Sequence, residues 1–349
     1  MGAAKFPLAL GRATSYVGVL LMFTAQSTQL VHGIHREAQP RCSPRRCSLR
    51  SSPLAHYRYV ALAAGMICLG CTDTPNDSLG PTSPSLAGAV VPAVLVGAGD
   101  IAGCGPEYED EATAKLLDGI AGTVFTLADN VYEDGTAAEF KNCYGPSWGR
   151  HRARTRPSVG NHEYHTPRGA GYFGYFGDRA GPSGQGYYSY NLGSWHIIAL
   201  DSERNLAAQA VWLKADLAAN PRKCTLAYWH KPLFTSGDIP GAPTLKNVFT
   251  ILYNANADVV VQGHNHIYER FYPQDPNGKA NLARGIRTFV VGTGGAPLLP
   301  MKAKTPNLQV RQNTSHGVLK FSLYPTWYKW EFVPVAGKTF RDSGSNNCH

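Results

Sequence analysis

The sequence has no apolar run of the roughly 18 to 20 residues that a membrane-spanning helix needs. Its longest apolar stretches, 16–23 and 60–70, are much shorter. It also lacks the composition of a disordered chain, because only 16% of its 349 residues are charged and 43% are hydrophobic. Internal repeats are absent as well. We therefore expect a globular protein with no transmembrane span.

The basic residues that give a net charge of +9 are unevenly distributed. The first 70 residues contain eight Lys or Arg and a single acid, Glu37, whereas the remainder contains 25 basic and 23 acidic residues. The body of the chain is therefore almost neutral. A nucleic-acid-binding face would need a basic groove, so we expect no nucleic-acid partner.

The basic N-terminal part reads as a leader over residues 1–71. Arg58 precedes the apolar stretch 60–70, as in a signal peptide, and Cys71 follows it. Leu69-Gly70-Cys71 also resembles the end of a bacterial lipoprotein cleavage box. A lipid anchor at Cys71, ordinary secretion and a plain apolar linker remain alternatives. The expected location is extracytoplasmic: secreted, periplasmic or lipid-anchored.

The segment 72–89 is rich in Pro, Ser and Thr and is expected to be a flexible linker. The folded domain is expected to span 90–349. It contains four of the eight cysteines, an even number that favours two disulfides in an exported chain. Of the three possible pairings we favour Cys104–Cys143 with Cys224–Cys348. Because no pair has the C-x2-C spacing of a zinc site, we do not expect these cysteines to bind metal.

Runs of β-branched and aromatic residues predict strands at 93–97, 123–127, 187–191, 195–200, 224–229, 258–262, 287–292, 317–323 and 328–332. Apolar residues at helical spacing predict helices at 110–120, 205–220 and 244–255. Strands and helices alternate in the first part, and the tail is almost entirely β. The pattern predicts an α/β protein with two packed sheets and helices outside them.

Metal-binding residue types follow the ends of these strands. The clusters are Gly99-Asp100, Asp129-Asn130-Val131-Tyr132, Gly160-Asn161-His162-Glu163, His230 and Gly263-His264-Asn265-His266. Ligands of α/β sheets bind beyond the carboxyl ends of the strands, so the five clusters are expected to meet in one crevice. Their oxygen and nitrogen donors suit Fe, Mn or Zn. Seven such ligands exceed what one catalytic metal takes from a protein, which predicts two metals with a shared carboxylate.

His264 and His266 are two positions apart and can serve different metals only if the chain turns between them. Gly263 is expected to permit that turn.

This ordered series, followed by Tyr268-Glu269-Arg270, resembles the calcineurin-like metallophosphoesterases and, within them, the purple acid phosphatases. The resemblance covers about 93–340. It implies a four-layer αββα sandwich of two mixed β-sheets flanked by helices. It also implies an exported enzyme that hydrolyses small phosphomonoesters by attack of a metal-bound hydroxide.

The resemblance further implies a role for each residue. The first metal, Fe(III) in the purple enzymes, would bind Asp100, Asp129, Tyr132 and His266. The second, which is Fe, Zn or Mn, would share Asp129 and be completed by Asn161, His230 and His264. His162 would protonate the departing alkoxide or bind a phosphate oxygen. Tyr132 distinguishes this branch, because a tyrosinate stabilises a ferric ion.

Two departures from the family pattern are visible. Ala128 stands before Asp129, where glycine is usual. The segment 231–240 has no histidine, whereas plant and animal purple phosphatases carry a substrate-facing histidine there. His165 and Arg168 are candidates to replace it.

Other functions compete with this interpretation. Gly97-x-Gly99-x-x-Ala102 matches a dinucleotide fingerprint, and Gly145-x-Ser147-x-Gly149 matches a serine-hydrolase elbow in letters. Neither accounts for the histidine clusters. The alternatives that remain are a phosphodiesterase acting on small diesters and an exported metal- or phosphate-binding module with weak catalysis.

Overall fold

A computed structural model describes residues 90–182 and 184–349. The expected leader 1–71, the lipid-anchor candidate Cys71 and the linker 72–89 lie outside the described residues. Within the described part, no helix is both long and apolar enough to cross a membrane.

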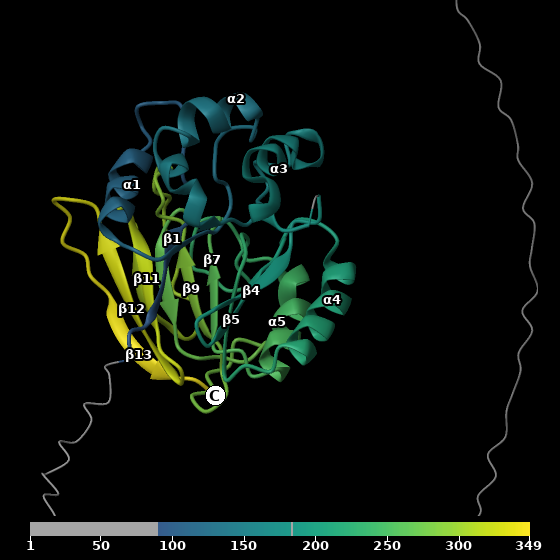
Figure 1. The fold of residues 1–349 in the computed structure, drawn as a ribbon. Helices are drawn as coiled ribbons and strands as arrows, with labels where there is room; N and C mark the ends of the chain where they lie inside the picture. The colour runs from purple at the N-terminus through teal and green to yellow at the C-terminus, as the bar shows by residue number, and fades with distance from the viewer. Residues whose placement is uncertain (1–89, 183) are drawn as a thin grey trace, which may run out of the picture. The chain divides into compact units, whose positions relative to one another are not determined.

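Two mixed β-sheets form the centre of the molecule (Figure 1). One has the strand order β13-β12-β11-β1-β2-β3, with β1 (Ala93–Ala98), β2 (Thr123–Thr126), β3 (Thr155–Arg156), β11 (Gly317–Leu323), β12 (Trp327–Pro334) and β13 (Ser343–Asn347). The other has the order β10-β8-β9-β7-β6-β5-β4, with β4 (Tyr188–Leu192), β5 (Trp195–Ala199), β6 (Cys224–Tyr228), β7 (Val259–Gln262), β8 (Tyr268–Phe271), β9 (Arg287–Val291) and β10 (Leu308–Gln312).

Helices lie outside the sheets and at one end of them. They are α1 (Asp110–Gly119), α2 (Ala137–Glu139), α3 (Ala170–Phe176), α4 (Leu206–Ala219) and α5 (Lys246–Asn254). Leu213 of α4 and Leu252 of α5 pack with Val260 of β7 in one apolar cluster. Leu117 of α1 belongs to the larger cluster between the sheets. The predicted αββα fold class is therefore confirmed.

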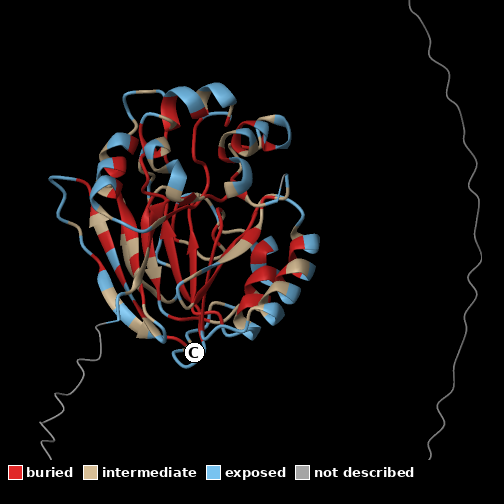
Figure 2. Ribbon diagram, viewed as in Figure 1, coloured by how far each residue is buried: buried red, intermediate tan, exposed pale blue. Residues whose placement is uncertain are grey.

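The strands of the two sheets are buried to different extents, because helices cover the outer face of one sheet and leave part of the other exposed. The strands β5, β6, β7 and β9 are buried along their whole length, as expected of parallel strands covered on both faces. In β12 the buried residues alternate with more exposed ones, so one face of this strand meets solvent. Figure 2 shows the buried centre and the exposed outer sides of the helices.

Four strands of the structure were not predicted from the sequence: β3, β8, β10 and β13. Three of them, β3, β10 and β13, lie at the edges of the sheets. Strand β13 has the sequence SGSNN, which has no apolar alternation, and its place is set by antiparallel pairing with β12. The aromatic segment 172–176 is part of α3, where Tyr172 and Phe176 lie one turn apart and are both buried.

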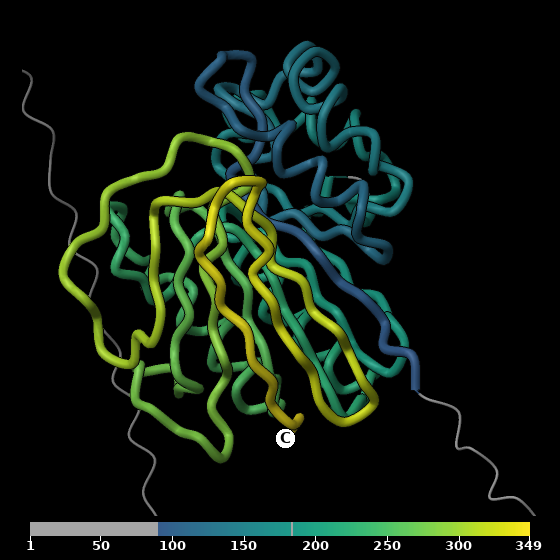
Figure 3. The backbone as a smooth tube through the Cα atoms, turned by 90° about the vertical axis from the view of Figure 1, so that its left-hand side faces the viewer, coloured from purple at the N-terminus to yellow at the C-terminus, as the bar shows by residue number. Residues whose placement is uncertain are grey.

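Long-range contacts join the first and last parts of the described chain. Strand β1 pairs antiparallel with β11, and Figure 3 shows this first strand running beside the last strands. Both favoured disulfides are confirmed: Cys104–Cys143 and Cys224–Cys348, with Cα atoms 5.1 and 5.4 Å apart.

Candidate metal centre

The polar clusters are brought together at the carboxyl ends of the strands. Asp100 follows β1, Asp129 follows β2, His230 follows β6 and His264 follows β7, while Asn161 lies in the loop after β3. Parallel pairing of β1 with β2 and of β6 with β7 aligns these ends. The ends that carry these residues are thus aligned within each sheet.

The loops that carry these residues adopt an unusual backbone. Asp100, Ala128, Asp129 and His264 have left-handed φ values of 58°, 69°, 41° and 70°. Such conformations cost about 1–3 kcal/mol each for residues other than glycine, and they gather at functional sites. The expectation that Gly263 supplies the turn is wrong, because the positive φ belongs to His264. Glycine is needed at 263 for close approach, since a Cβ there would lie 2.8 Å from Asp100 Oδ2.

A first set of donors, the Tyr132 group, consists of Asp100, Tyr132 and His266. The Tyr132 hydroxyl donates to Asp100 Oδ1 at 3.1 Å and lies 3.1 Å from His266 Nε2. His266 Nε2 is 3.5 Å from Asp100 Oδ1. These three atoms thus surround a common point.

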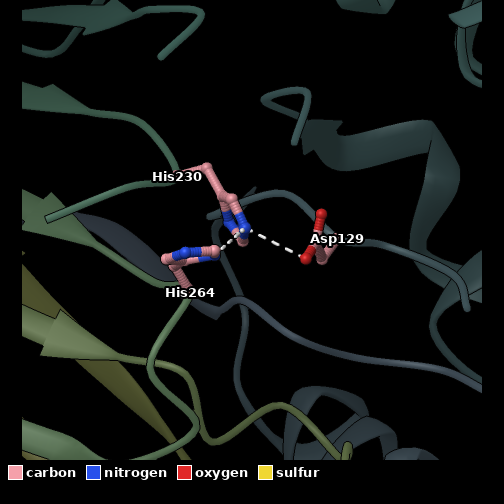
Figure 4. A group of neighbouring side chains, drawn as sticks. All are labelled: Asp129, His230 and His264. Carbon is pink, nitrogen blue, oxygen red and sulfur yellow. Dashed lines mark hydrogen bonds and ion pairs between the residues drawn. The ribbon is translucent and has the colours of Figure 1, made fainter. Parts of the chain in front are cut away.

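A second set, the His230 group, consists of Asp129, His230 and His264 (Figure 4). One ligand atom from each lies within 4.8 Å of the other two. His230 Nε2 is 3.0 Å from Asp129 Oδ2 and 3.1 Å from His264 Nδ1. Asp129 and His230 are almost completely buried.

The carboxylate of Asp129, a member of the His230 group, also contacts the Tyr132 group. Its Oδ2 lies 3.0 Å from His230 Nε2 and 3.4 Å from the Tyr132 hydroxyl. One oxygen therefore lies between the two donor sets, which is the position that a bridging carboxylate would need.

Asn161 is next to this carboxylate. On one side of it the His162 backbone N–H donates to Asp129 Oδ1 at 3.1 Å, and on the other a Cβ added to Gly160 would lie 2.2 Å from that same oxygen. The buried side-chain oxygen of Asn161 has no hydrogen-bond partner. A buried acceptor without a donor is costly, and a cation would satisfy it. The residues present therefore fit a metal.

Backbone carbonyls orient two of the imidazoles. His230 Nδ1–H donates to the carbonyl of Leu127 and His266 Nδ1–H to that of Pro297, both at 2.8 Å. These bonds leave each Nε2 facing the donor groups. Support of this kind on the far ring nitrogen is usual for metal-binding histidines.

The electrostatics of the cluster favour a cation. Burial alone lowers the pKa of His230, but the Asp129 carboxylate more than reverses this, and the pKa rises to about 10. Burial and neighbouring His230 lower the pKa of His264 to about 3, so its ring is neutral and has a free lone pair. Burial and Asp100 raise the pKa of Tyr132 well above its usual value. Its phenol therefore keeps its proton in the absence of a metal, and a bound cation would take the place of that proton.

His162 and His165 lie at the mouth of the site. Both Nδ1–H groups donate to the carbonyl of Glu133, at 2.6 and 3.0 Å, and the ring centres are 4.8 Å apart. His162 Nε2 lies 3.9 Å from Asp129 Oδ2. Of the two candidates for the missing histidine, both of which are exposed, His165 is the one whose ring lies beside that of His162.

Glu163 lies in the Gly160–Glu163 motif, but no role was predicted for it from the sequence. Its buried carboxylate accepts hydrogen bonds from the backbone N–H groups of Asn130 at 2.6 Å and Gly160 at 2.8 Å. It therefore ties the loop of Asp129 to the loop of Asn161. The signal available in the sequence was a glutamate in the same motif as the predicted ligand Asn161.

Both competing motifs lack the structure that they require. The segment after β1 does not open a helix, since α1 begins only at Asp110. Ser147 is buried, and its hydroxyl donates to the carbonyls of Cys143 and Tyr144 rather than lying exposed on a strand-to-helix turn.

The family model of the calcineurin-like phosphoesterases matches residues 90–268, just over half of the 349 residues. Purple acid phosphatase 22 of Arabidopsis thaliana is 32% identical over 148 residues, covering 38% of this chain and 34% of that protein. Purple acid phosphatase 15 of the same plant is 33% identical over 132 residues, covering 34% and 24%. The chain thus spans about a third or less of the length of these relatives.

Solved structures share the fold. A purple acid phosphatase from yellow lupin (Lupinus luteus) seeds superposes with a TM-score of 0.58 at 17% identity, covering 72% of this chain and 53% of that one. The anchor protein in the inner membrane complex of Plasmodium superposes with a TM-score of 0.60 at 14% identity, covering 74% and 90%. These likenesses agree in fold, and the match of the family model over half of the chain shows that the chain belongs to the calcineurin-like phosphoesterase family.

Proposed function

We propose that the protein is a binuclear-metal phosphomonoesterase. The observation that carries the proposal is the Asp129 carboxylate, whose Oδ2 lies between the Tyr132 group and the His230 group. One metal would be held by Asp100, Tyr132, His266 and Asp129, and the other by Asp129, Asn161, His230 and His264. Such a pair of cations supplies charge neutralisation of phosphate oxygens and an activated water.

His162 is the proposed catalytic residue. Its Nδ1–H is fixed on the Glu133 carbonyl, so Nε2 is the atom that faces the site. Its side chain is 21% exposed, which leaves it open to a substrate. From Nε2 an imidazolium donates a hydrogen bond to a phosphate oxygen or passes its proton to the departing alkoxide.

Fe(III) is the proposed occupant of the Tyr132 group, with Fe, Zn or Mn in the His230 group. The support is the buried Tyr132 hydroxyl, which lies 3.1 Å from both Asp100 Oδ1 and His266 Nε2, because a tyrosinate oxygen stabilises a ferric ion. Purified protein should absorb visible light through phenolate-to-iron charge transfer, and Tyr132→Phe should remove the band while leaving the fold unchanged by circular dichroism. Metal-loaded wild-type protein without this band would rule out iron bound to Tyr132.

Small phosphate esters are the proposed substrates, and the near-neutral body of the chain supports the absence of a nucleic-acid partner. The test compares an aryl phosphate with the corresponding aryl diester on metal-loaded protein. We expect the monoester to be hydrolysed at least tenfold faster. A faster diester would favour the phosphodiesterase alternative. Full metal content with no hydrolysis of either compound would instead support a binding module.

An extracytoplasmic location is proposed, with 1–71 as leader, 72–89 as linker and 90–349 as catalytic domain. The two disulfides support it, because such bonds persist in oxidising compartments. Fractionation of the producing cells, with mass spectrometry of the mature N-terminus, tests this and also whether Cys71 carries lipid.

A further inference from the structure

A hollow of about 490 Å³ opens on the described surface and contains none of the proposed metal ligands. We call it the arginine hollow, and it is lined by Arg152, Arg156, Phe176, Gly177, Asp178 and Arg179. Arg152 belongs to the 3-10 helix Trp148–Arg154, Arg156 to β3, and Arg179 to the turn that follows α3. Three arginines from three elements thus line one hollow.

These arginines differ from their neighbours in the same segment. Arg150 pairs with Glu111 at 2.6 Å and with Asp118 at 2.9 Å. Arg154 donates to backbone carbonyls, including that of Ile120 at 2.9 Å. Among residues 90–182 and 184–349, Arg152, Arg156 and Arg179 form no ion pair and donate no side-chain hydrogen bond. Their donors are therefore free for a ligand.

Aromatic rings hold two of the guanidinium groups in place. Arg152 lies over the ring of Tyr175 at 5.0 Å, and Arg156 lies over the ring of Tyr190 of β4 at 5.3 Å. This stacking lowers the entropy that each side chain would lose on binding a ligand. The hollow is thus partly organised before any ligand arrives.

The lining of the arginine hollow contains one acidic residue, Asp178, whose carboxylate partly neutralises the three arginines. The net charge of these four side chains is positive, so the arginines repel one another, and a bound anion would reduce this repulsion. Guanidinium forks match the oxygens of a phosphate group, which offers more acceptor oxygens and more negative charge to three arginines than a carboxylate does.

We propose that the arginine hollow is a second phosphate-binding site, distinct from the metal centre. The ligand is a phosphate dianion, either free inorganic phosphate or the terminal phosphate of a larger molecule. The hollow shares no residue with the two donor groups, so its occupancy does not depend on the phosphatase proposal.

Calorimetric titration of the metal-loaded full chain with inorganic phosphate tests the proposal. The double variant Arg156→Gln/Arg179→Gln should lose one binding event, with an affinity about 100-fold weaker, because each lost charged hydrogen-bonding group costs about tenfold. Its kcat on an aryl phosphate should stay at the wild-type value. Arg204→Gln is the matched control, since Arg204 also stacks on an aromatic ring, Tyr164 at 3.8 Å, but lies outside the hollow.

Methylphosphonate distinguishes the two sources of the phosphate group. Arginine-dependent binding of both probes means that the hollow accepts a phosphate carried by a larger molecule, and binding of inorganic phosphate alone means that it takes the free ion. Equal phosphate binding by the wild type and the double variant would overturn the proposal. So would complete competition by chloride at matched ionic strength, because that would show charge screening without a site.

Discussion

Counting only His, Cys, Asp and Glu, the described chain contains two places where three potential ligand atoms lie close together, and only one of these two suits a metal. One is the His230 group, and the other consists of Cys224, Asp258 and Cys348. In the second place both sulfurs are joined in a disulfide. The Asp258 carboxylate accepts the backbone N–H groups of Thr225 and His349, both at 2.8 Å. Proximity alone therefore does not make a metal site, because the lone pairs must also be free.

The two places differ in the groups that surround their aspartates, Asp129 and Asp258. Asp129 faces imidazoles and a phenol, groups that can give up protons to make room for a cation. Asp258 faces backbone amides, which cannot. Both carboxylates are buried, yet one is arranged for binding and the other for holding the C-terminal end against the neighbouring strand.

The largest expected difference is in metal content. Asp129→Asn should lose both metals, since it removes the one carboxylate that both groups share, and hydrolysis of an aryl phosphate should fall by about a thousandfold or more. Asp258→Asn is the matched control and should keep both metals. Elemental analysis of the two variants measures this. Equal metal content in the two variants would contradict the claim that the place around Asp129 binds metal and the place around Asp258 does not.

His162 separates catalysis from metal binding within the first place. His162→Ala should lower kcat by about 10²- to 10⁴-fold, the usual contribution of a general acid, while the metal content stays at the wild-type value. Elemental analysis and turnover of the same preparation give both quantities. A metal-free His162→Ala protein would mean that this residue is a ligand and would refute the assigned role.

Asp258, in the second place, should make the free energy of unfolding depend on pH. Burial raises the pKa of Asp258 from 3.8 to about 6, so between these values the folded chain binds more protons here than the unfolded chain. Its contribution to the free energy of unfolding therefore falls as pH rises from about 4 to 6, by about 2 kcal/mol. Denaturant unfolding of wild type and Asp258→Asn at pH 4 and 7 isolates this slope. A wild-type slope retained in the variant would refute the assignment.

The smallest effect concerns the strained backbone beside Asp129. Ala128 is fully buried with a φ of 69°, a left-handed conformation that favours glycine. Ala128→Gly should raise the free energy of unfolding by about 1 kcal/mol, because the left-handed penalty exceeds the loss of one buried methyl group. Urea denaturation measures it, with Ala114→Gly in α1 as a control that should be destabilising. A destabilised Ala128→Gly protein would show that the methyl packing dominates.

Much of this arrangement could be predicted from the sequence, because strand ends and ligand types are local features. The positions of Asp100, Asp129, His230 and His264 followed from apolar runs that end in polar residues. The role of Glu163 did not follow, because its partners are backbone amides on another loop. The same holds for the support of His230 and His266 by the carbonyls of Leu127 and Pro297. Backbone partners leave no trace in residue identity.

The edges of the fold were equally hard to predict. Strand β13 exists because β12 offers it hydrogen bonds, and its own residues have low strand propensity. The turn at His264 was assigned to Gly263 because glycine is the usual left-handed residue, but contact with Asp100 already requires the glycine there. In both cases long-range packing overrode the local signal.

The most direct test of the central claim is the metal stoichiometry of the purified wild-type chain, measured by elemental analysis against quantitative amino-acid analysis. Seven converging side chains with one shared carboxylate predict two metal ions for each chain after loading. A chain that binds a single ion, or none, under conditions where circular dichroism shows it to be folded would contradict the account.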